Sequence, residues 1–436
     1  MERRDFLKLS ALASSSLLVP SFLKGMENIN LKGSGYKHLV IIQLSGGNDG
    51  LNTVIPFSQS EYYRLRPSVG ITGAKVLKLT QDLGLNPALK GMRALYDNSE
   101  LCILNSVGYP NPNRSHFRSM DIWHTGSNSN EYWTSGWLGR YMDSSCSNTY
   151  NVVEIDKTLS LALKGNQKNA LAFTNTSDFY KGTREAYMKK LVEKASSENL
   201  GEDNLGYLYK TLIDTSSSAT FLHDKTKTYT SKQAYPRNKL AQKLKTSAEL
   251  INSGVETKVH YMSHSGFDTH AFQQQKQGNL LKQYDEAITA FVKDLKENGT
   301  FNDTLILTFS EFGRRVKENG SKGTDHGTAN NLFVIGGNLN KAGFLLALFI
   351  FSYLNWRFVE NKIQSIKILA CISLGVIIIF ALLIFDIPDE MEILNIPNKL
   401  FLLKVKNLDT LNDIYHRYYR QIITGINFFL FIYFII

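Results

Sequence analysis

Continuous runs of apolar and β-branched residues alternate along the chain with longer segments whose apolar residues recur at helical spacing. The runs predict buried strands at residues 38–44, 101–107, 255–261, 303–310 and 331–335. The helical spacing predicts a long helix over 274–298, shorter helices over 183–197 and 239–251, and a helix that begins near Met120. This alternation indicates an α/β domain with a doubly wound, mostly parallel sheet over residues 36–343. Residues 155–250 carry no motif, and we interpret them as a cap or insertion over that sheet.

The hydrophobic pattern changes sharply after Gly343. Residues 345–353 are almost wholly apolar, and residues 368–385 form an uncharged run near the ~20 residues that a membrane span needs. Lysines precede this run and acidic residues follow it, which would place its lysine side in the cytoplasm. We therefore expect a membrane tail over 344–436 with a transmembrane helix at about 368–385.

The first residues predict a targeting segment rather than part of the fold. Arg3 and Arg4 precede Phe6, and a modestly apolar stretch extends from Leu9 to Leu23. This start resembles a bacterial twin-arginine signal over residues 1–25 and implies the twin-arginine export machinery as a partner and the periplasm as the destination. A cytoplasmic amphipathic helix is the alternative.

Charge and cysteine content exclude few classes of function. The net charge of +10 comes from scattered residues without a dense basic block, so we expect no nucleic-acid partner. The three cysteines do not form a disulfide framework, and at most Cys102 and Cys146 form one bridge.

Acidic and imidazole side chains follow several predicted strands. Asp268 and His270 follow one strand, Glu311 ends another, and Asp325 and His326 precede the last. Functional residues of open parallel sheets gather at the carboxyl ends of strands, so we expect these side chains at one edge. Carboxylate and imidazole ligands suit a divalent metal, Zn²⁺ or Mn²⁺. The alternative for Glu311 is an ion pair with a neighbouring arginine.

Six motifs in order resemble the exported family known as domain of unknown function 1501. They are Leu44–Asn52, Arg114–Phe117, Gly136–Arg140, Gly266–His270, Ser310–Arg315 and Gly323–Gly327. That family is similar to the alkaline phosphatase and sulfatase superfamily, which implies an alkaline phosphatase-like fold. The resemblance also implies metal ligands at Asp49, Asp268, His270, Glu311 and His326. Asp49 alternatively serves only in a turn or as a helix cap.

The sequence departs from the superfamily pattern at two points. Phe312 stands where a metal-binding histidine is common, and the spacing between Asp268 and His270 is shorter than usual. Both departures argue against a site for two metals. The family also continues beyond Phe344 with more soluble chain, so we expect the sheet to be incomplete.

A catalytic role is predicted for the loop after the second strand. Ser115 would be the nucleophile, Arg114 would hold the oxyanion, and His116 would protonate the leaving group. Arg314 and Arg315 are alternatives for the oxyanion, and His264 is an alternative acid. Ser115 alternatively only makes a turn.

The tail has a resemblance of its own. Residues 352–361, within a segment covering 344–390, are similar to the late helices of membrane acyltransferases that O-acylate cell-surface sugars. The early helices of that family are absent, and we interpret the chain as chimeric or truncated. A genuine membrane anchor is the alternative.

Three functions follow from these patterns. The first is an exported metal-dependent hydrolase of a phosphate or sulfate ester, with a small-molecule or glycan substrate. The second is a non-catalytic exported protein of the same fold that binds a glycan or a partner. The third is a fragment of a membrane O-acyltransferase.

Overall fold

The computed structural model describes residues 37–197, 204–339 and 342–346. The predicted targeting segment, the run at 368–385 and Cys371 lie outside this part. Among the residues it describes, no helix combines the length and apolar character required to cross a membrane.

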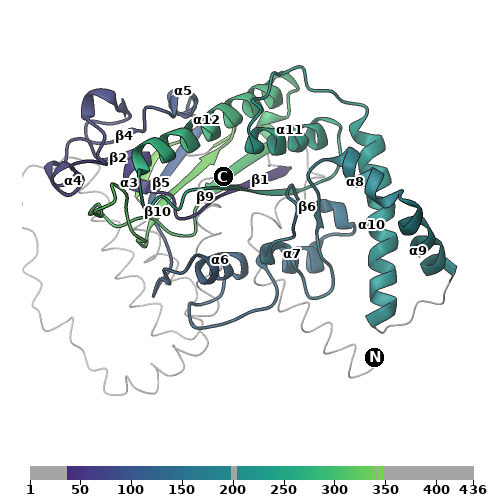
Figure 1. Cartoon of the computed structure of the whole chain (residues 1–436). Coiled ribbons are helices and arrows are strands. Elements are labelled where there is room, and N and C mark those ends of the chain that lie inside the picture. Colours follow the sequence, from purple (N-terminus) through teal and green to yellow (C-terminus); the bar gives the residue numbers. More distant parts are fainter. Residues whose placement is uncertain (1–36, 198–203, 340–341, 347–436) are drawn as a thin grey trace, which may run out of the picture. The chain divides into compact units, whose positions relative to one another are not determined.

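A mixed sheet of eight strands forms the centre of the domain (Figure 1). Its spatial order is β11-β5-β10-β9-β1-β8-β6-β7. The strands are β1 (His38–Ser45), β5 (Leu101–Val107), β6 (Val152–Glu154), β7 (Leu171–Ala172), β8 (Val259–Ser265), β9 (Thr304–Phe309), β10 (Asn330–Ile335) and β11 (Gly343–Leu346). All neighbours pair in parallel except β10, which is antiparallel to both β5 and β9. The predicted α/β class with a mostly parallel sheet is therefore confirmed.

Most of the predicted strands form where the apolar runs lie. The run predicted at 255–261 is displaced, because β8 begins at Val259 and continues to Ser265. His264 therefore lies in a strand and not in the loop where we expected it. The strand β11 crosses the boundary expected after Gly343 and pairs with β5 at the sheet edge.

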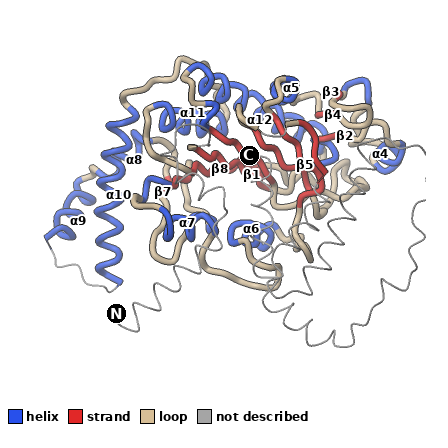
Figure 2. The backbone as a smooth tube through the Cα atoms, turned by 180° about the vertical axis from the view of Figure 1, so that it is seen from behind, coloured by secondary structure: helices blue, strands red, loops and turns tan. Residues whose placement is uncertain are grey.

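Helices cover both faces of the sheet. Figures 1 and 2 show α5 (Lys90–Asp97), α11 (Lys239–Asn252) and α12 (Gln273–Glu297) on one face, with α6 (His116–Thr125) and α7 (Trp137–Ser145) on the other. The long helix α12 buries one apolar stripe in the main core, including Leu281, Ile288 and Leu295. This stripe is the source of the helical spacing seen in the sequence.

The region 155–250 contributes to the sheet as well as to its surroundings. It contains β7 at the sheet edge, and α11, whose buried residues belong to the main core. The helices α8 (Thr176–Thr183), α9 (Ala186–Ser197) and α10 (Asn204–Thr226) lie together beside β6 (Figure 1).

A smaller unit follows β1. It contains α3 (Gly50–Thr53), α4 (Ser60–Leu65) and a three-stranded sheet of β2 (Val54–Ile55), β4 (Gly84–Leu85) and β3 (Leu77–Lys78). Ile55, Tyr62, Ile71 and Val76 form its core. Short 3₁₀ turns lie at Gly73–Lys75, Thr149–Asn151, Leu161–Leu163 and Phe301–Asp303.

The bridge that the sequence allowed between Cys102 and Cys146 is not formed. Cys102 and Cys146 are both buried free thiols. Cys102 lies within β5, where burial raises the pKa of its thiol to about 12, so this residue acts as a small apolar core side chain.

A candidate metal centre at the carboxyl edge of the sheet

Five chain segments meet at one edge of the sheet. The strands β1, β8 and β9 are adjacent and parallel, so their carboxyl ends lie together. Because β10 is antiparallel to β5 and β9, its start and the end of β5 lie at the same edge. The segments that carry His116, Asp268, Glu311 and His326 therefore converge, as the strand pattern predicts.

Two glycines let the chain turn closely after β1. Gly46 has φ +117°, and a Cβ there would stand 2.4 Å from the backbone nitrogen of Asp268. Gly47 has φ +66°, and its Cβ would stand 2.4 Å from the ring of Phe312. Side chains are excluded at both positions, which allows the segments bearing Asp268 and Phe312 to approach β1.

One oxygen of Asp268 is the centre of the cluster. Its Oδ1 accepts a hydrogen bond from Arg314 Nη2 at 2.7 Å and lies 3.0 Å from His270 Nε2. It also lies 3.3 Å from His326 Nε2 and 3.4 Å from His116 Nε2. Burial by itself would raise the pKa of Asp268, but the hydrogen bond and charge of Arg314, together with the histidines, lower it to about 2. The carboxyl group is therefore ionised at neutral pH.

The other nitrogen of each imidazole faces an oxygen. His116 Nδ1 lies 2.8 Å from Glu311 Oε1, His326 Nδ1 lies 2.8 Å from the Arg114 carbonyl oxygen, and His270 Nδ1 lies 3.3 Å from Asp325 Oδ1. These acceptors place the proton of each neutral ring on Nδ1. The lone pair of each ring is then on Nε2, directed into the cluster.

This arrangement places electron-rich atoms against one another. His270 Nε2 and His326 Nε2 are only 2.9 Å apart, and both lie beside Asp268 Oδ1. His116 Nε2 is buried and has no hydrogen-bond partner within the described part of the chain. Arg314 Nη1 faces His270 Nε2 at 3.4 Å, but the lone pairs of the three rings still repel one another unless a proton or a cation lies between them.

The residues present fit a divalent cation. Ligand atoms of His116, Asp268 and His326 all lie within 4.8 Å of one another, and imidazole with carboxylate is a donor set for Zn²⁺ or Mn²⁺. Hydrogen bonds from the outer imidazole nitrogen to oxygen are typical of metal-binding histidines. With neutral imidazoles, the three carboxylates of Asp268, Glu311 and Asp325 outnumber the guanidinium groups of Arg314 and of Arg315, which acts on Asp325, and this negative excess favours a cation.

Arg314 and Phe312 hold the cluster in place. Buried Arg314 donates to the carbonyl oxygens of Gly46, Gly47, Phe267 and Thr324 as well as to Asp268. The ring of Phe312 packs on His116 at 4.7 Å and on His326 at 4.9 Å between centroids. The phenyl ring thus supplies an apolar wall beside two of the three imidazoles.

Glu311 does not contact the converging Nε2 atoms and reaches the cluster through Nδ1 of His116. Its Oε1 faces His116 Nδ1 and accepts a hydrogen bond from Gly46 N at 2.8 Å, and its Oε2 accepts one from Ser310 Oγ at 3.2 Å. It makes no ion pair with Arg314 or Arg315 in the described structure. The hydrogen bond that Glu311 accepts from His116 is the largest influence on this imidazole and raises its pKa.

Asp49 does not join the cluster, contrary to expectation. Its buried carboxylate pairs with Arg66, accepts hydrogen bonds from Gln273 and from Leu51 N, and caps α3. The three donors occupy both oxygens. The alternative of a helix cap is therefore the role that the structure gives Asp49, because the preceding glycine turn directs its carboxylate toward Arg66.

The predicted catalytic residues surround the start of α6. Ser115 occupies the N-cap position, exposed and without a side-chain hydrogen bond to the helix. Arg114 is exposed and reaches the cluster through its carbonyl oxygen. His264, the alternative acid, lies under α12 with its Nε2 3.2 Å from the Leu280 carbonyl oxygen, and burial lowers its pKa.

Sequence reasoning missed two roles in the cluster. His116 was expected to act as an acid, but its Nε2 converges on Asp268 with the other imidazoles. Arg314 was only an alternative to Arg114 for the oxyanion contact, and the structure shows it buried and bound to Asp268. His116 follows a polar loop and precedes a helix, and nothing in this local sequence indicates where its Nε2 points.

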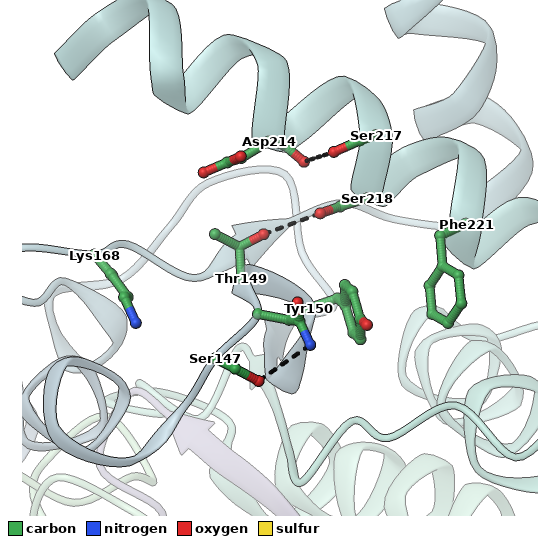
Figure 3. A pocket seen from close by; sticks show the side chains of 9 residues that line it. Ser147, Thr149, Tyr150, Lys168, Asp214, Ser217, Ser218 and Phe221 are labelled. Atoms are coloured by element: carbon green, nitrogen blue, oxygen red, sulfur yellow. Dashed lines mark hydrogen bonds between the residues drawn. The ribbon is translucent and has the colours of Figure 1, made fainter. Parts of the chain in front are cut away.

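A separate cavity of about 300 Å³ lies between α10 and the segment at 147–150 (Figure 3). Its polar groups largely satisfy one another: Thr149 Oγ1 and Ser218 Oγ are 3.0 Å apart, and Lys168 Nζ donates to the Cys146 carbonyl oxygen. Tyr150 stacks on Phe221. None of the predicted site residues lines this cavity.

The chain belongs to the family described as Protein of unknown function (DUF1501), whose model matches residues 99–346. The family resemblance is thereby confirmed, and five of the six motifs, all except Leu44–Asn52, lie within the matched residues. No curated protein matches the chain.

Several solved structures are similar to this chain. The C-terminal periplasmic domain of EcEptC from Escherichia coli, in complex with Zn, has 10% identity and a TM-score of 0.34, covering 70% of this chain and 73% of that one. The lipoteichoic acid synthase LtaP from Listeria monocytogenes has 9% identity and a TM-score of 0.34, covering 74% and 73%. The PsFucS1 sulfatase from Pseudoalteromonas sp. has 13% identity and a TM-score of 0.32, covering 79% and 72%. At this level of similarity, the chemistry of the chain has to come from its own residues.

Proposed function

We propose that this protein is an exported metal-dependent hydrolase of a phosphate or sulfate ester. The observation that carries the proposal is the convergence of three imidazole Nε2 atoms on one oxygen of Asp268, with each Nδ1 held by an oxygen. His116, Asp268, His270 and His326 would hold the ion. A divalent cation would supply Lewis acidity toward an ester oxygen.

The surrounding residues have defined tasks in this proposal. Glu311, Asp325 and the Arg114 carbonyl hold a proton on each Nδ1, which keeps the Nε2 lone pairs available. Arg314 fixes Asp268 and keeps it ionised. The guanidinium of Arg114 would offset the negative charge of the ester, and Ser115 remains the predicted nucleophile.

The experiment pairs metal content with ester hydrolysis. Purified full-length chain, loaded with Zn²⁺ or Mn²⁺, is assayed on p-nitrophenyl phosphate and p-nitrophenyl sulfate. Metal-dependent release of p-nitrophenol that His326→Ala abolishes and Arg237→Gln retains supports the proposal. Hydrolysis that is indifferent to both the metal and His326→Ala contradicts it.

One observation favours a non-catalytic binding protein of the same fold. The Ser115 hydroxyl makes no hydrogen bond to a histidine or carboxylate among the described residues, so nothing there activates it as a nucleophile. A metal-loaded chain without activity on either ester, which nevertheless binds a glycan, would identify this second function.

Export and membrane attachment remain proposals from the sequence. The twin-arginine pattern supports passage to the periplasm, and the apolar run at 368–385 supports a membrane anchor. A fusion of the whole chain to a reporter active only outside the cytoplasm tests the export, with Arg3→Lys and Arg4→Lys together as the variant that should block it.

A further inference from the structure

A cleft of about 450 Å³ opens beside the metal cluster. It lies where β5 ends, β10 starts and α3 begins, and Arg114 and Arg314 belong both to its lining and to the surroundings of the cluster. A group bound in the cleft would therefore lie next to the cluster.

One buried amide oxygen in the cleft lacks a donor. Asn331 is only 9% exposed, and its Nδ2 donates to Asn105 Oδ1. Its Oδ1 has no hydrogen-bond partner in the part of the protein that the structure describes. A buried acceptor without a donor is unfavourable, so a rotation of the Asn331 side chain that turns this oxygen into the cleft would let a ligand hydroxyl satisfy it. A Cβ at Gly50 would stand 2.9 Å from this oxygen, so only glycine fits beside Asn331.

The backbone around the cleft departs from regular strand geometry. Ser106 has φ +61° although it is not glycine, and it lines the cleft near the end of β5. The register between β5 and β10 shifts between Asn330 and Leu332. Such left-handed residues and bulges redirect side chains and concentrate at functional sites.

The lining is basic, with an apolar side. Arg114 and Arg315 are both exposed, and neither guanidinium donates a hydrogen bond within the described residues. No acidic side chain lines the cleft, and Asp325, whose pKa the charge of Arg315 lowers, lies outside its lining. Leu51, Val54 and Pro56 supply apolar surface within the same lining. An anion is favoured over a cation here, and the apolar side suits the C–H face of a sugar ring.

We propose that this cleft binds an anionic sugar and positions it for cleavage at the cluster. The inference rests on the proposed hydrolase function for its catalytic meaning. Arg315 binds the anionic group, Asn331 Oδ1 accepts a hydrogen bond from a ring hydroxyl, and Leu51 and Val54 pack on the ring.

The test uses D-glucuronate, which combines a carboxylate with ring hydroxyls and has no ester to cleave. Binding to the metal-loaded full chain is measured by calorimetry or ligand-observed NMR, beside D-glucose and acetate. Glucuronate should bind more tightly than either part alone. Arg315→Gln should weaken glucuronate binding about tenfold, the loss expected for one charge-assisted hydrogen bond, and should leave D-glucose binding unchanged.

Two controls separate the cleft from the rest of the protein. Arg237→Gln removes an exposed arginine outside the lining and should bind glucuronate as the wild type does. Asn331→Leu should weaken both sugars, and a thermal melt of that variant shows whether it is folded. Absence of saturable glucuronate binding, or equal binding by Arg315→Gln and Arg237→Gln, overturns the inference.

Metal content distinguishes this inference from the proposed function. If the chain binds metal but Arg315→Gln has no effect on glucuronate binding, the inference of a sugar-binding cleft is wrong and the metal centre stands. If the chain binds glucuronate through Arg315 but binds no metal, the cleft is supported and the proposed hydrolase function is wrong.

Discussion

His116 Nδ1 lies 2.8 Å from Glu311 Oε1, and Glu311 is buried two residues after the end of β9. This contact joins the start of α6 to the carboxyl end of a central strand. It fixes the ring of His116 and leaves Nε2 directed at Asp268. A carboxylate outside a ligand histidine also makes that imidazole a stronger donor.

Replacing Glu311 with glutamine should weaken metal binding without removing a ligand. The amide keeps the size of the side chain but loses the charge that holds the proton on His116 Nδ1. We expect the affinity for Zn²⁺ to fall by about 10–100-fold, measured by competition with a coloured chelator. Glu256→Gln, at an exposed position, should match the wild type, and equal affinities for both variants would contradict the role of Glu311.

The buried pair of Asp49 and Arg66 should stabilise the fold without affecting the metal. Both side chains are fully buried, and removing one member of such a pair costs about 3–5 kcal/mol because the other charge is left unpaired. Arg66→Met should lower the free energy of unfolding by that amount in urea titrations. Asp49→Asn should leave the number of metal ions bound per chain unchanged. Loss of the metal in that variant would show that Asp49 is a metal ligand.

Gly47 should not tolerate a side chain. An alanine at φ +66° would be strained, and its Cβ would meet the ring of Phe312 at 2.4 Å. We expect Gly47→Ala to lower the melting temperature and weaken metal binding together, because Phe312 packs on two of the ligand histidines. The control is Gly278→Ala in α12, where a Cβ meets open space. A helical alanine should stabilise the chain there by about 0.5–1 kcal/mol.

Glu154 should make the stability of the fold dependent on pH. Burial, the largest cause, raises the pKa of this carboxyl from 4.5 to about 7. Below pH 4.5 the group is protonated in both the folded and the unfolded chain. As pH rises toward 7, the unfolded chain releases its proton first, so the folded state loses stability across that window.

The variant Glu154→Gln should remove this loss. At pH 8 its free energy of unfolding should exceed that of the wild type by about 2–3 kcal/mol, and the difference should shrink toward pH 4. Urea titrations at several pH values measure it, with Glu256→Gln as an exposed control. A difference that does not vary with pH would contradict the raised pKa.

The sheet was predictable because its signal is local. A strand buried on both faces reads as a continuous apolar run, so β1, β5, β9 and β10 appear at their predicted places. The end of β8 was predicted too early, since polar Ser263 and His264 interrupt its apolar pattern although His264 is buried. The antiparallel direction of β10 depends on how the chain returns to the sheet, which no local pattern encodes.

The site was predictable in its location but not in the roles of its residues. Strand ends placed Asp268, His270, Glu311 and His326 at one edge, and the structure brings them together. The division between His116, whose Nε2 faces Asp268, and Glu311, which supports it, depends on contacts between residues 195 positions apart. The role of Asp49 also depends on contacts between distant segments, because its partners Arg66 and Gln273 come from other parts of the chain. The sequence therefore did not reveal that these partners occupy its carboxylate.

The most direct test of the metal centre is the metal content of purified full-length chain after dialysis against Zn²⁺ or Mn²⁺ and removal of free metal. We predict about one divalent ion per chain, held by histidine and carboxylate ligands, and its loss in both Asp268→Ala and His326→Ala. Folded wild-type chain without stoichiometric metal, or variants with undiminished metal content, would contradict the account.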